Sequence, residues 1–207
     1  MTESQPTRWD VEQVAHQDRW QSYVDRFTRL HESGADTDGE ARFIDALADR
    51  QSTVLDAGCG AGRVAAALRK LGHTTVGVDK DAGHIAVGRS RYPGLPLLPH
   101  DLLTLDAPTL NRAHMPAEFD IIVLAGNVMV YLASGSERAV LANLVKLLRP
   151  GGKLVIGFAT DREYGVEQLD TDASRIGVTL ENRFDTWQLA KFDGASGWAT
   201  SVFVRPA

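Results

Sequence analysis

Three alternating glycines between an apolar run and an alanine-rich segment constrain this chain more than any other feature. Residues 54–63 read Val-Leu-Asp-Ala-Gly-Cys-Gly-Ala-Gly-Arg, and residues 64–71 have the composition of a helix. Glycine permits a sharp turn between a strand and a helix, and it lets a ligand approach the bare main chain. The pattern therefore predicts a βαβ unit whose first turn is a ligand site.

A carboxylate follows at the end of the next expected strand, residues 74–78. Asp79 stands 17 positions after Gly62. In a βαβ unit, a carboxylate at this distance is placed to bind the hydroxyls of a ribose. The two features together predict a site for an adenosine compound. The alternative is a tight strand-to-helix turn in an unrelated α/β protein, and Asp79 counts against it.

The spacing of the glycines separates two classes of adenosine cofactor. Dinucleotide sites follow G-x-G-x-x-G, which would require glycine at position 63, where this chain has Arg63. The actual spacing, D-x-G-x-G-x-G from Asp56 to Gly62, resembles the first motif of the class I S-adenosylmethionine-dependent methyltransferases. In that family the turn surrounds the amino-acid portion of the cofactor. A nicotinamide or flavin protein is the weaker interpretation.

Further motifs of that family match between positions 40 and 160. Asp79 with Lys80 resembles the second motif, and Asp101 with Leu102 resembles the third, at the adenine. Residues 119–127 resemble the fourth motif, and residues 149–154 resemble its Arg-Pro-Gly-Gly turn. The resemblance implies S-adenosyl-L-methionine as cofactor, S-adenosyl-L-homocysteine as product, and these binding residues: Asp56, Gly58, Cys59, Gly60, Asp79, Lys80, Asp101, Leu102, Ala125 and Asn127.

Three of these positions have a structural alternative. Asp101 can cap a turn after a proline-rich strand, and Asn127 can be a turn residue that contacts no ligand. Cys59 fits the turn as a small spacer against the cofactor. These alternatives stay open at the level of the sequence.

The resemblance also implies the fold, a three-layer α-β-α sandwich. Its mostly parallel seven-stranded sheet has the order 3-2-1-4-5-7-6 and ends in an antiparallel hairpin. The residue patterns predict the last two strands at 180–192 and 198–205, with a short loop between them. We expect one compact protein with an N-terminal helical cap segment, 1–39, and a methyltransferase domain, 40–207. An amphipathic helix, or two, is predicted over 8–31.

Bulk properties limit the partners. The chain has 207 residues, enough for one buried core, and a net charge of -5 that counts against nucleic-acid binding. A single cysteine excludes an internal disulfide framework, and the polar start lacks the core of a signal peptide. No apolar stretch is long enough to span a bilayer. We expect a cytoplasmic monomer or homodimer without membrane or nucleic-acid partners.

Methyl transfer from a sulfonium needs little catalytic machinery. The positive charge already activates the leaving group, so the protein must align the acceptor's lone pair with the methyl carbon and exclude water. No metal is required, and the six histidines show no metal-ligand spacing. We predict a small-molecule acceptor, methylated by in-line displacement. A non-catalytic cofactor-binding module, or a methyltransferase acting on protein or RNA, is the alternative.

Acceptor residues are expected at the carboxyl edge of the sheet. Tyr131 and His31 are the candidates for a general base or an orienting group. Their structural alternatives are a side chain packed under a helix and a solvated loop residue. The further candidates for the acceptor pocket are Asn127, Phe158, Arg162, Tyr23 and Phe27.

Overall fold

Strands and helices alternate along most of this chain. The computed structural model describes residues 6–15, 33 and 36–207. Its strands are β1 (Thr53–Ala57), β2 (Thr74–Asp79), β3 (Leu97–Pro99), β4 (Phe119–Leu124), β5 (Leu148–Ala159), β6 (Thr179–Phe184) and β7 (Trp198–Val204). Its helices are α1 (Arg8–Ala15), α3 (Gly39–Leu47), α4 (Arg63–Lys70), α5 (Ala82–Arg91), α6 (Ala107–Arg112), α7 (Val128–Tyr131), α8 (Glu137–Leu147) and α9 (Val166–Arg175).

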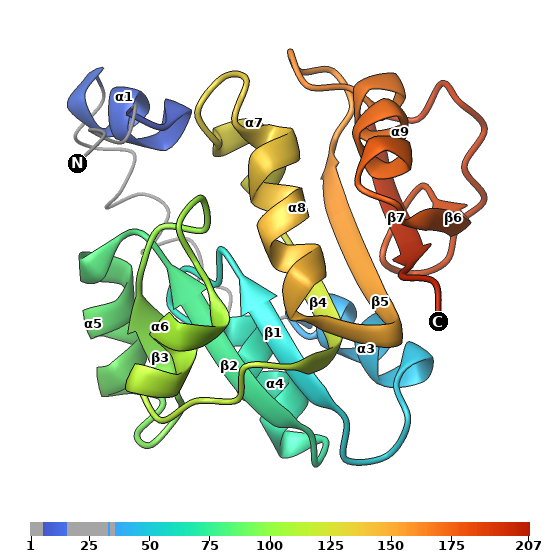
Figure 1. The fold of residues 1–207 in the computed structure, drawn as a ribbon. Helices are drawn as coiled ribbons and strands as arrows, with labels where there is room; N and C mark the ends of the chain where they lie inside the picture. Colours follow the sequence, from blue (N-terminus) through green and yellow to red (C-terminus); the bar gives the residue numbers. More distant parts are fainter. Residues whose placement is uncertain (1–5, 16–32, 34–35) are drawn as a thin grey trace.

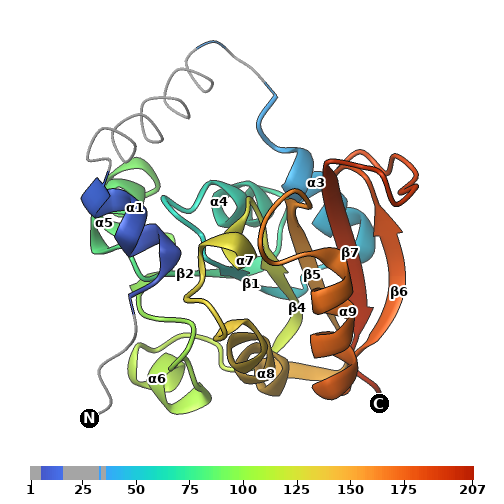
Figure 2. The same ribbon diagram turned by 90° about the horizontal axis from the view of Figure 1, so that it is seen from above.

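The seven strands form one sheet in the order β3-β2-β1-β4-β5-β7-β6 (Figure 1). Strands β1 to β5 pair in parallel, whereas β7 runs antiparallel to both of its neighbours. Seen from above, α3, α4 and α5 cover one face of the sheet, and α6, α8 and α9 cover the other (Figure 2). The predicted three-layer sandwich, strand order and terminal antiparallel pair are therefore confirmed.

The central strands are apolar because helices cover them on both faces. In β1, Val54 and Leu55 have no exposed surface, and in β4 the same holds for Ile122 and Val123. Strands of a doubly covered parallel sheet have continuous apolar runs for this reason. Side chains from the two faces enter two separate clusters, one beneath α8 and α9 and one beneath α3 and α4. This packing fixes the carboxyl ends of β1, β2 and β4 at one edge.

The end of the chain differs from the predicted strand boundaries. The sequence predicts a strand over 180–192, but β6 ends at Phe184 and a longer connection leads to β7. Trp187 accounts for the difference. Its ring packs edge-on against Phe43 of α3, 5.4 Å between centroids, and lies over Gly157 of β5, where a Cβ would come within 2.3 Å of it. The chain turns after β6 and packs this partly buried indole against α3 and β5.

The predicted helix over 8–31 is described only in its first part, α1. Residues 16–32 lie outside the described residues, and with them His31 and most of the predicted apolar face. The division into a cap segment, 1–39, and a domain, 40–207, therefore stays a prediction. Of the helices that the structure describes, none has the length and apolar character needed to cross a membrane.

Candidate active site

The glycine turn joins β1 to α4, and a main-chain hydrogen bond holds it to β2. Gly58 N donates to Val78 O at 2.8 Å. Gly58, Gly60 and Gly62 have φ values of 77°, 54° and 79°, in a region that side chains disfavour. A Cβ at Gly58 would also lie 2.5 Å from Val128 Cγ2. The turn therefore needs glycine for its backbone, and at Gly58 for close packing as well.

Asp79 stands at the end of β2 and is oriented by this turn. Its Oδ2 accepts a hydrogen bond from Gly60 N at 2.7 Å, and its Oδ1 accepts one from Asp81 N at 2.8 Å. Burial raises the pKa of the carboxyl, while the two backbone N–H groups act in the opposite direction. Each carboxylate oxygen has a second lone pair. Asp79 can therefore accept further hydrogen bonds from the hydroxyls of a ribose.

Asp56 lies beneath the turn. Its side chain is buried, and its Oδ2 accepts a hydrogen bond from Ala65 N in the first turn of α4, at 3.1 Å. Burial raises the pKa of Asp56 to about 7, although the hydrogen bond from Ala65 and the charge of Arg63 act to lower it. The side chain fixes the start of α4, and its contact with a cofactor stays a prediction.

Three further predicted cofactor residues lie near the crevice described below but not in its lining. Cys59 packs against β2, where a Cβ at Gly77 would lie 2.9 Å from its Sγ. Asn127 has a left-handed backbone, φ 71°, and its Oδ1 accepts a hydrogen bond from Ala159 N at 2.8 Å. Its side chain thus connects the ends of β4 and β5, as the turn-residue interpretation expects. Ala125 is half-buried directly after β4.

One crevice at the carboxyl edge of the sheet brings the other predicted residues together. Its lining includes Gly58, Gly60, Asp79, Lys80, Asp101, Leu102 and Tyr131. It holds about 720 Å³ of unfilled space, part of it open to solvent. At Gly126, which also lines it, no atom of the described residues, its two chain neighbours aside, lies within 4 Å of the Cβ position. A carboxylate at one end and bare main chain at the other fit a cofactor with nucleoside and amino-acid parts.

Helix α1 contributes Trp9 to the lining of this crevice, and it lies near α7 in Figure 1 and near α5 in Figure 2. Trp9 Nε1 donates to Asp81 Oδ2 at 3.3 Å. The Trp9 ring lies 5.4 Å from the ring of Tyr131, nearly perpendicular to it at 80°. On the next residue, Asp10 forms an ion pair with Lys80. The helix therefore spans the crevice from the end of β2 to α7.

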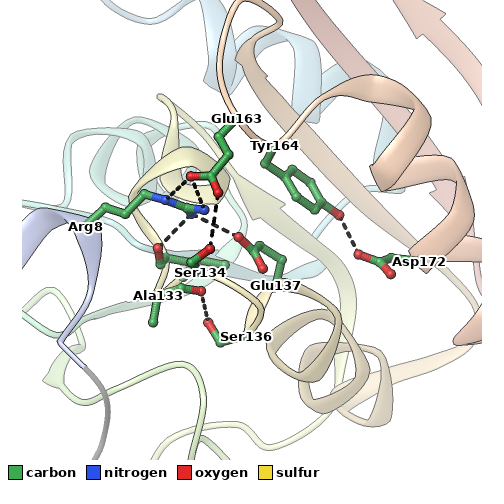
Figure 3. Close-up of polar contacts among 9 residues, drawn as sticks. Arg8, Ala133, Ser134, Ser136, Glu137, Glu163, Tyr164 and Asp172 are labelled. Atoms are coloured by element: carbon green, nitrogen blue, oxygen red, sulfur yellow. Dashed lines mark hydrogen bonds and ion pairs between the residues drawn. The ribbon is translucent and has the colours of Figure 1, made fainter.

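Arg8 fixes α1 to the far side of the crevice (Figure 3). Its guanidinium donates to Leu132 O, Glu137 Oε1 and Glu163 Oε2, each at 2.9 Å. The Glu137 side chain is only 7% exposed, whereas that of Glu163 is 72% exposed. Burial acts to lower the pKa of Arg8, but the two carboxylates outweigh it and raise that pKa. We name Arg8, Glu137 and Glu163 the Arg8 clasp.

The predicted set omits six residues of the lining: Thr7, Trp9, His84, Gly126, Val128 and Leu132. Gly126 and Val128 flank Asn127, so the sequence identified the segment but not the residues that face the crevice. His84 lies in the first turn of α5 beside Trp9, 5.6 Å between ring centroids. No motif or periodic pattern marks Trp9, because contacts distant in sequence bring it to the site.

The predicted acceptor residues have different positions. Tyr131 lines the crevice. Phe158 does not, because it is fully buried and packs on Tyr164, 6.0 Å between ring centroids. Arg162 is exposed and pairs with its neighbour Asp161 at 3.4 Å. The remaining candidates lie outside the described residues: Tyr23, Phe27 and His31.

Several expected absences stay predictions. Within the described ranges, no group of three or more His, Cys, Asp or Glu side chains is arranged to hold a metal ion. A metal-independent reaction, the lack of nucleic-acid partners and the monomeric or dimeric state all require experiments.

Comparison with known proteins tests the expected family. A family model described as a methyltransferase domain matches residues 54–152. The crystal structure of a TehB-like SAM-dependent methyltransferase from Corynebacterium glutamicum is 35% identical to this chain, with a TM-score of 0.82. The match covers 92% of this chain and 100% of that one. The likeness therefore extends well beyond the glycine turn.

Two curated relatives match over shorter stretches. The malonyl-[acyl-carrier protein] O-methyltransferase of Pectobacterium atrosepticum is 29% identical over 161 residues, 77% of this chain and 57% of that protein. The ribosomal protein L11 methyltransferase of Photorhabdus laumondii is 31% identical over 142 residues, 68% of this chain and 45% of that protein. The chain thus spans about half the length of the curated relatives it matches. By its glycine turn, its strand order and these matches, the chain belongs to the class I S-adenosylmethionine-dependent methyltransferases.

Proposed function

We propose that this chain transfers a methyl group from S-adenosyl-L-methionine to a small-molecule acceptor by in-line displacement. One observation carries the proposal. Gly58, Gly60 and Asp79 from the sheet line the same crevice as Trp9 from α1 and Tyr131 from α7. We assign the space between these two walls to the nucleoside cofactor and to a small second molecule beside it.

The sheet side of the crevice supplies the cofactor contacts. The carboxylate of Asp79 accepts hydrogen bonds from the ribose hydroxyls. Hydrogen bonds from Gly60 N and Asp81 N fix its orientation. Asp101 and Leu102 line the part of the crevice assigned to the adenine. The glycine turn and Gly126 leave main chain open to the amino-acid part. With these contacts, we expect the methyl group to point toward α1 and α7.

The α1 side excludes water from the reacting atoms. Trp9, Val128, Tyr131 and Leu132 give this wall an apolar character. The cofactor supplies an activated methyl group. The acceptor's lone pair forms the new bond to the methyl carbon as the carbon–sulfur bond breaks, and its electron pair remains on sulfur. Dry surroundings protect this step from competing hydrolysis.

Tyr131 is the described candidate for orienting an oxygen or nitrogen acceptor. It lines the crevice and lies beside Trp9 at the expected methyl position. An acceptor that loses a proton can pass it to water, while the Tyr131 hydroxyl holds the acceptor atom by a hydrogen bond. Tyr131→Phe separates the two roles of the residue, because it retains the ring and removes the hydroxyl.

The curated relatives favour a second candidate function. By their names, one acts on a malonyl group carried by an acyl-carrier protein and the other acts on a ribosomal protein. Acceptors attached to proteins therefore occur among similar sequences. The narrow cover formed by α1 favours the small molecule, since a protein segment would need to pass beneath it.

A labelling experiment distinguishes these candidates. The purified chain is incubated with a cell extract and with cofactor carrying a labelled methyl group, and the products are divided by ultrafiltration. We expect label in the low-molecular-mass fraction, less label with the Asp79→Ala variant at limiting cofactor, and no effect of prior protease or RNase treatment. Label retained with protein or RNA would refute the small-molecule proposal. Cofactor binding without any labelled product would favour a non-catalytic module.

A further inference from the structure

Trp9 and Tyr131 form an aromatic corner in the wall of the crevice that α1 provides. Their ring centroids are 5.4 Å apart, and their planes meet at 80°. Perpendicular rings are held together because the positive edge of one faces the negative face of the other. Both side chains line the crevice that contains Gly60 and Asp79. The corner therefore faces the site rather than the core.

The corner lies where the proposed function assigns the cofactor's sulfur. The sulfur joins the ribose, assigned to Asp79, to the amino-acid part, assigned to the glycine turn and the end of β4. Trp9 spans the same interval, because it reaches Asp81 after β2 by its indole N–H and Tyr131 after β4 by its ring. The sulfur is the centre of positive charge that changes during the reaction.

The charges around the corner suit a cation. Asp79 and Asp101 line the crevice, whereas Lys80 is paired with Asp10 and Arg8 is paired with Glu137 and Glu163. The Trp9 N–H also donates to a carboxylate, Asp81 Oδ2, at 3.3 Å. This hydrogen bond polarises the indole and makes the face of its ring more negative. Cations are attracted to the faces of Trp and Tyr, most strongly where water is excluded.

We infer that Trp9 and Tyr131 recognise the positive charge of the sulfonium and so distinguish the cofactor from its neutral product. The inference rests on the proposed function, since it takes S-adenosyl-L-methionine as the occupant. Methyl transfer removes the charge from sulfur, and the attraction of the two rings is lost at that step. The two rings therefore contribute more to binding of the charged cofactor than to binding of the neutral product.

Titration calorimetry with three ligands tests this. S-adenosyl-L-methionine and sinefungin carry a positive charge at the position in question, and S-adenosyl-L-homocysteine does not. The quantity of interest is the Kd of the homocysteine compound divided by the Kd of each cation. In Trp9→Leu we expect this ratio to fall by about threefold to thirtyfold, the range expected for cation–aromatic contacts. Tyr131→Leu should also lower this ratio.

Conservative variants provide the controls. Trp9→Phe and Tyr131→Phe keep a ring at each position, so most of the preference for cations should remain. Val14→Ala changes an 83% exposed residue of the same helix and should leave all three affinities unchanged. Thermal unfolding of each variant shows that the fold is retained.

The outcomes separate this inference from the proposed function. If Trp9→Leu weakened the binding of all three ligands equally, the ring would serve only to cover the crevice, and the inference would be overturned. The same conclusion would follow if Trp9→Phe lost the preference completely. If the unchanged protein bound none of the three ligands, the proposed function itself would fail.

Discussion

The two walls of the crevice are held in different ways. On the sheet side, main-chain hydrogen bonds fix the glycine turn to β2, and backbone N–H groups orient Asp79. On the α1 side, the contacts come from side chains: the Arg8 clasp, the Trp9 indole and the Asp10–Lys80 pair. The sheet side is thus part of the folded core, whereas the cover depends on a few contacts that can be removed singly.

This difference explains why one wall is visible in a motif and the other is not. A tight turn with positive φ accepts few residues besides glycine, so its sequence is restricted and has a regular spacing. A helix held by side chains can reach the same position with many sequences. We therefore expect changes in the sheet wall to damage fold and binding together, and changes in the cover to affect mainly binding and local stability.

The largest effect is expected from Gly58→Ala. The new Cβ would lie 2.5 Å from Val128 Cγ2, at a φ of 77°, so strain and overpacking together should lower the free energy of unfolding by about 2–5 kcal/mol. Urea unfolding measures this, and calorimetry should detect no cofactor binding. Gly72→Ala is the matched control, since Gly72 has positive φ but, within the described part of the chain and apart from its two neighbours, no atom within 4 Å of its Cβ position. Equal losses in both variants would show that the contact with Val128 is unimportant.

Asp56→Asn should change how stability depends on pH. Burial raises the pKa of Asp56 to about 7 from an ordinary value of 3.8, so between these values the folded state holds a proton that the unfolded state has lost. The contribution of Asp56 to the free energy of unfolding is fully present below about pH 4 and is lost as the pH rises to about 7. Relative to the unchanged protein, the Asp56→Asn variant should gain about 3 kcal/mol between roughly pH 5 and pH 8, measured by urea unfolding. A constant difference across this range would contradict the assignment.

Asp79→Ala should weaken cofactor binding by about 1–3 kcal/mol through the loss of hydrogen bonds to the ribose. It also leaves Gly60 N and Asp81 N without their carboxylate partner, so the melting temperature should fall as well. Calorimetry with S-adenosyl-L-homocysteine gives the first quantity and thermal unfolding gives the second. An affinity equal to that of the unchanged protein would show that the ribose lies elsewhere.

Arg8→Met tests the buried half of the clasp. Glu137, 7% exposed, would lose its guanidinium partner, and we expect a loss of about 1–3 kcal/mol in the free energy of unfolding. Adding Glu137→Gln to this variant should restore part of the stability, because the uncompensated charge is removed. If the double variant were no more stable than Arg8→Met, the charge of Glu137 would not be the cause.

Glu163→Gln should have the smallest effect. Its side chain is 72% exposed, and exposed ion pairs contribute less than about 1 kcal/mol and weaken with salt. Thermal unfolding at low and high salt measures the change. A loss as large as that of Arg8→Met would mean that the exposed half of the clasp carries the attachment of α1.

The sequence predicted most of the fold and the sheet side of the site. The apolar runs of β1 and β4, the glycine turn and Asp79 follow local rules, and the strand order was implied by the family resemblance. The predictions were wrong where contacts between residues far apart in the sequence determine the structure. Trp187 ends β6 early because it packs on Phe43 of α3, and Phe158 enters the core instead of the crevice.

The sequence by itself determined the βαβ turn and the carboxylate after β2, because backbone geometry at the turn leaves few residue choices, and the family resemblance of its motifs implied the class of cofactor. Only the tertiary structure decided that Trp9 meets Tyr131 and Asp81, and that Arg8 joins α1 to Glu137 and Glu163. These pairs are separated by up to 155 residues. No local pattern encodes them, since the folded sheet must first bring their partners together.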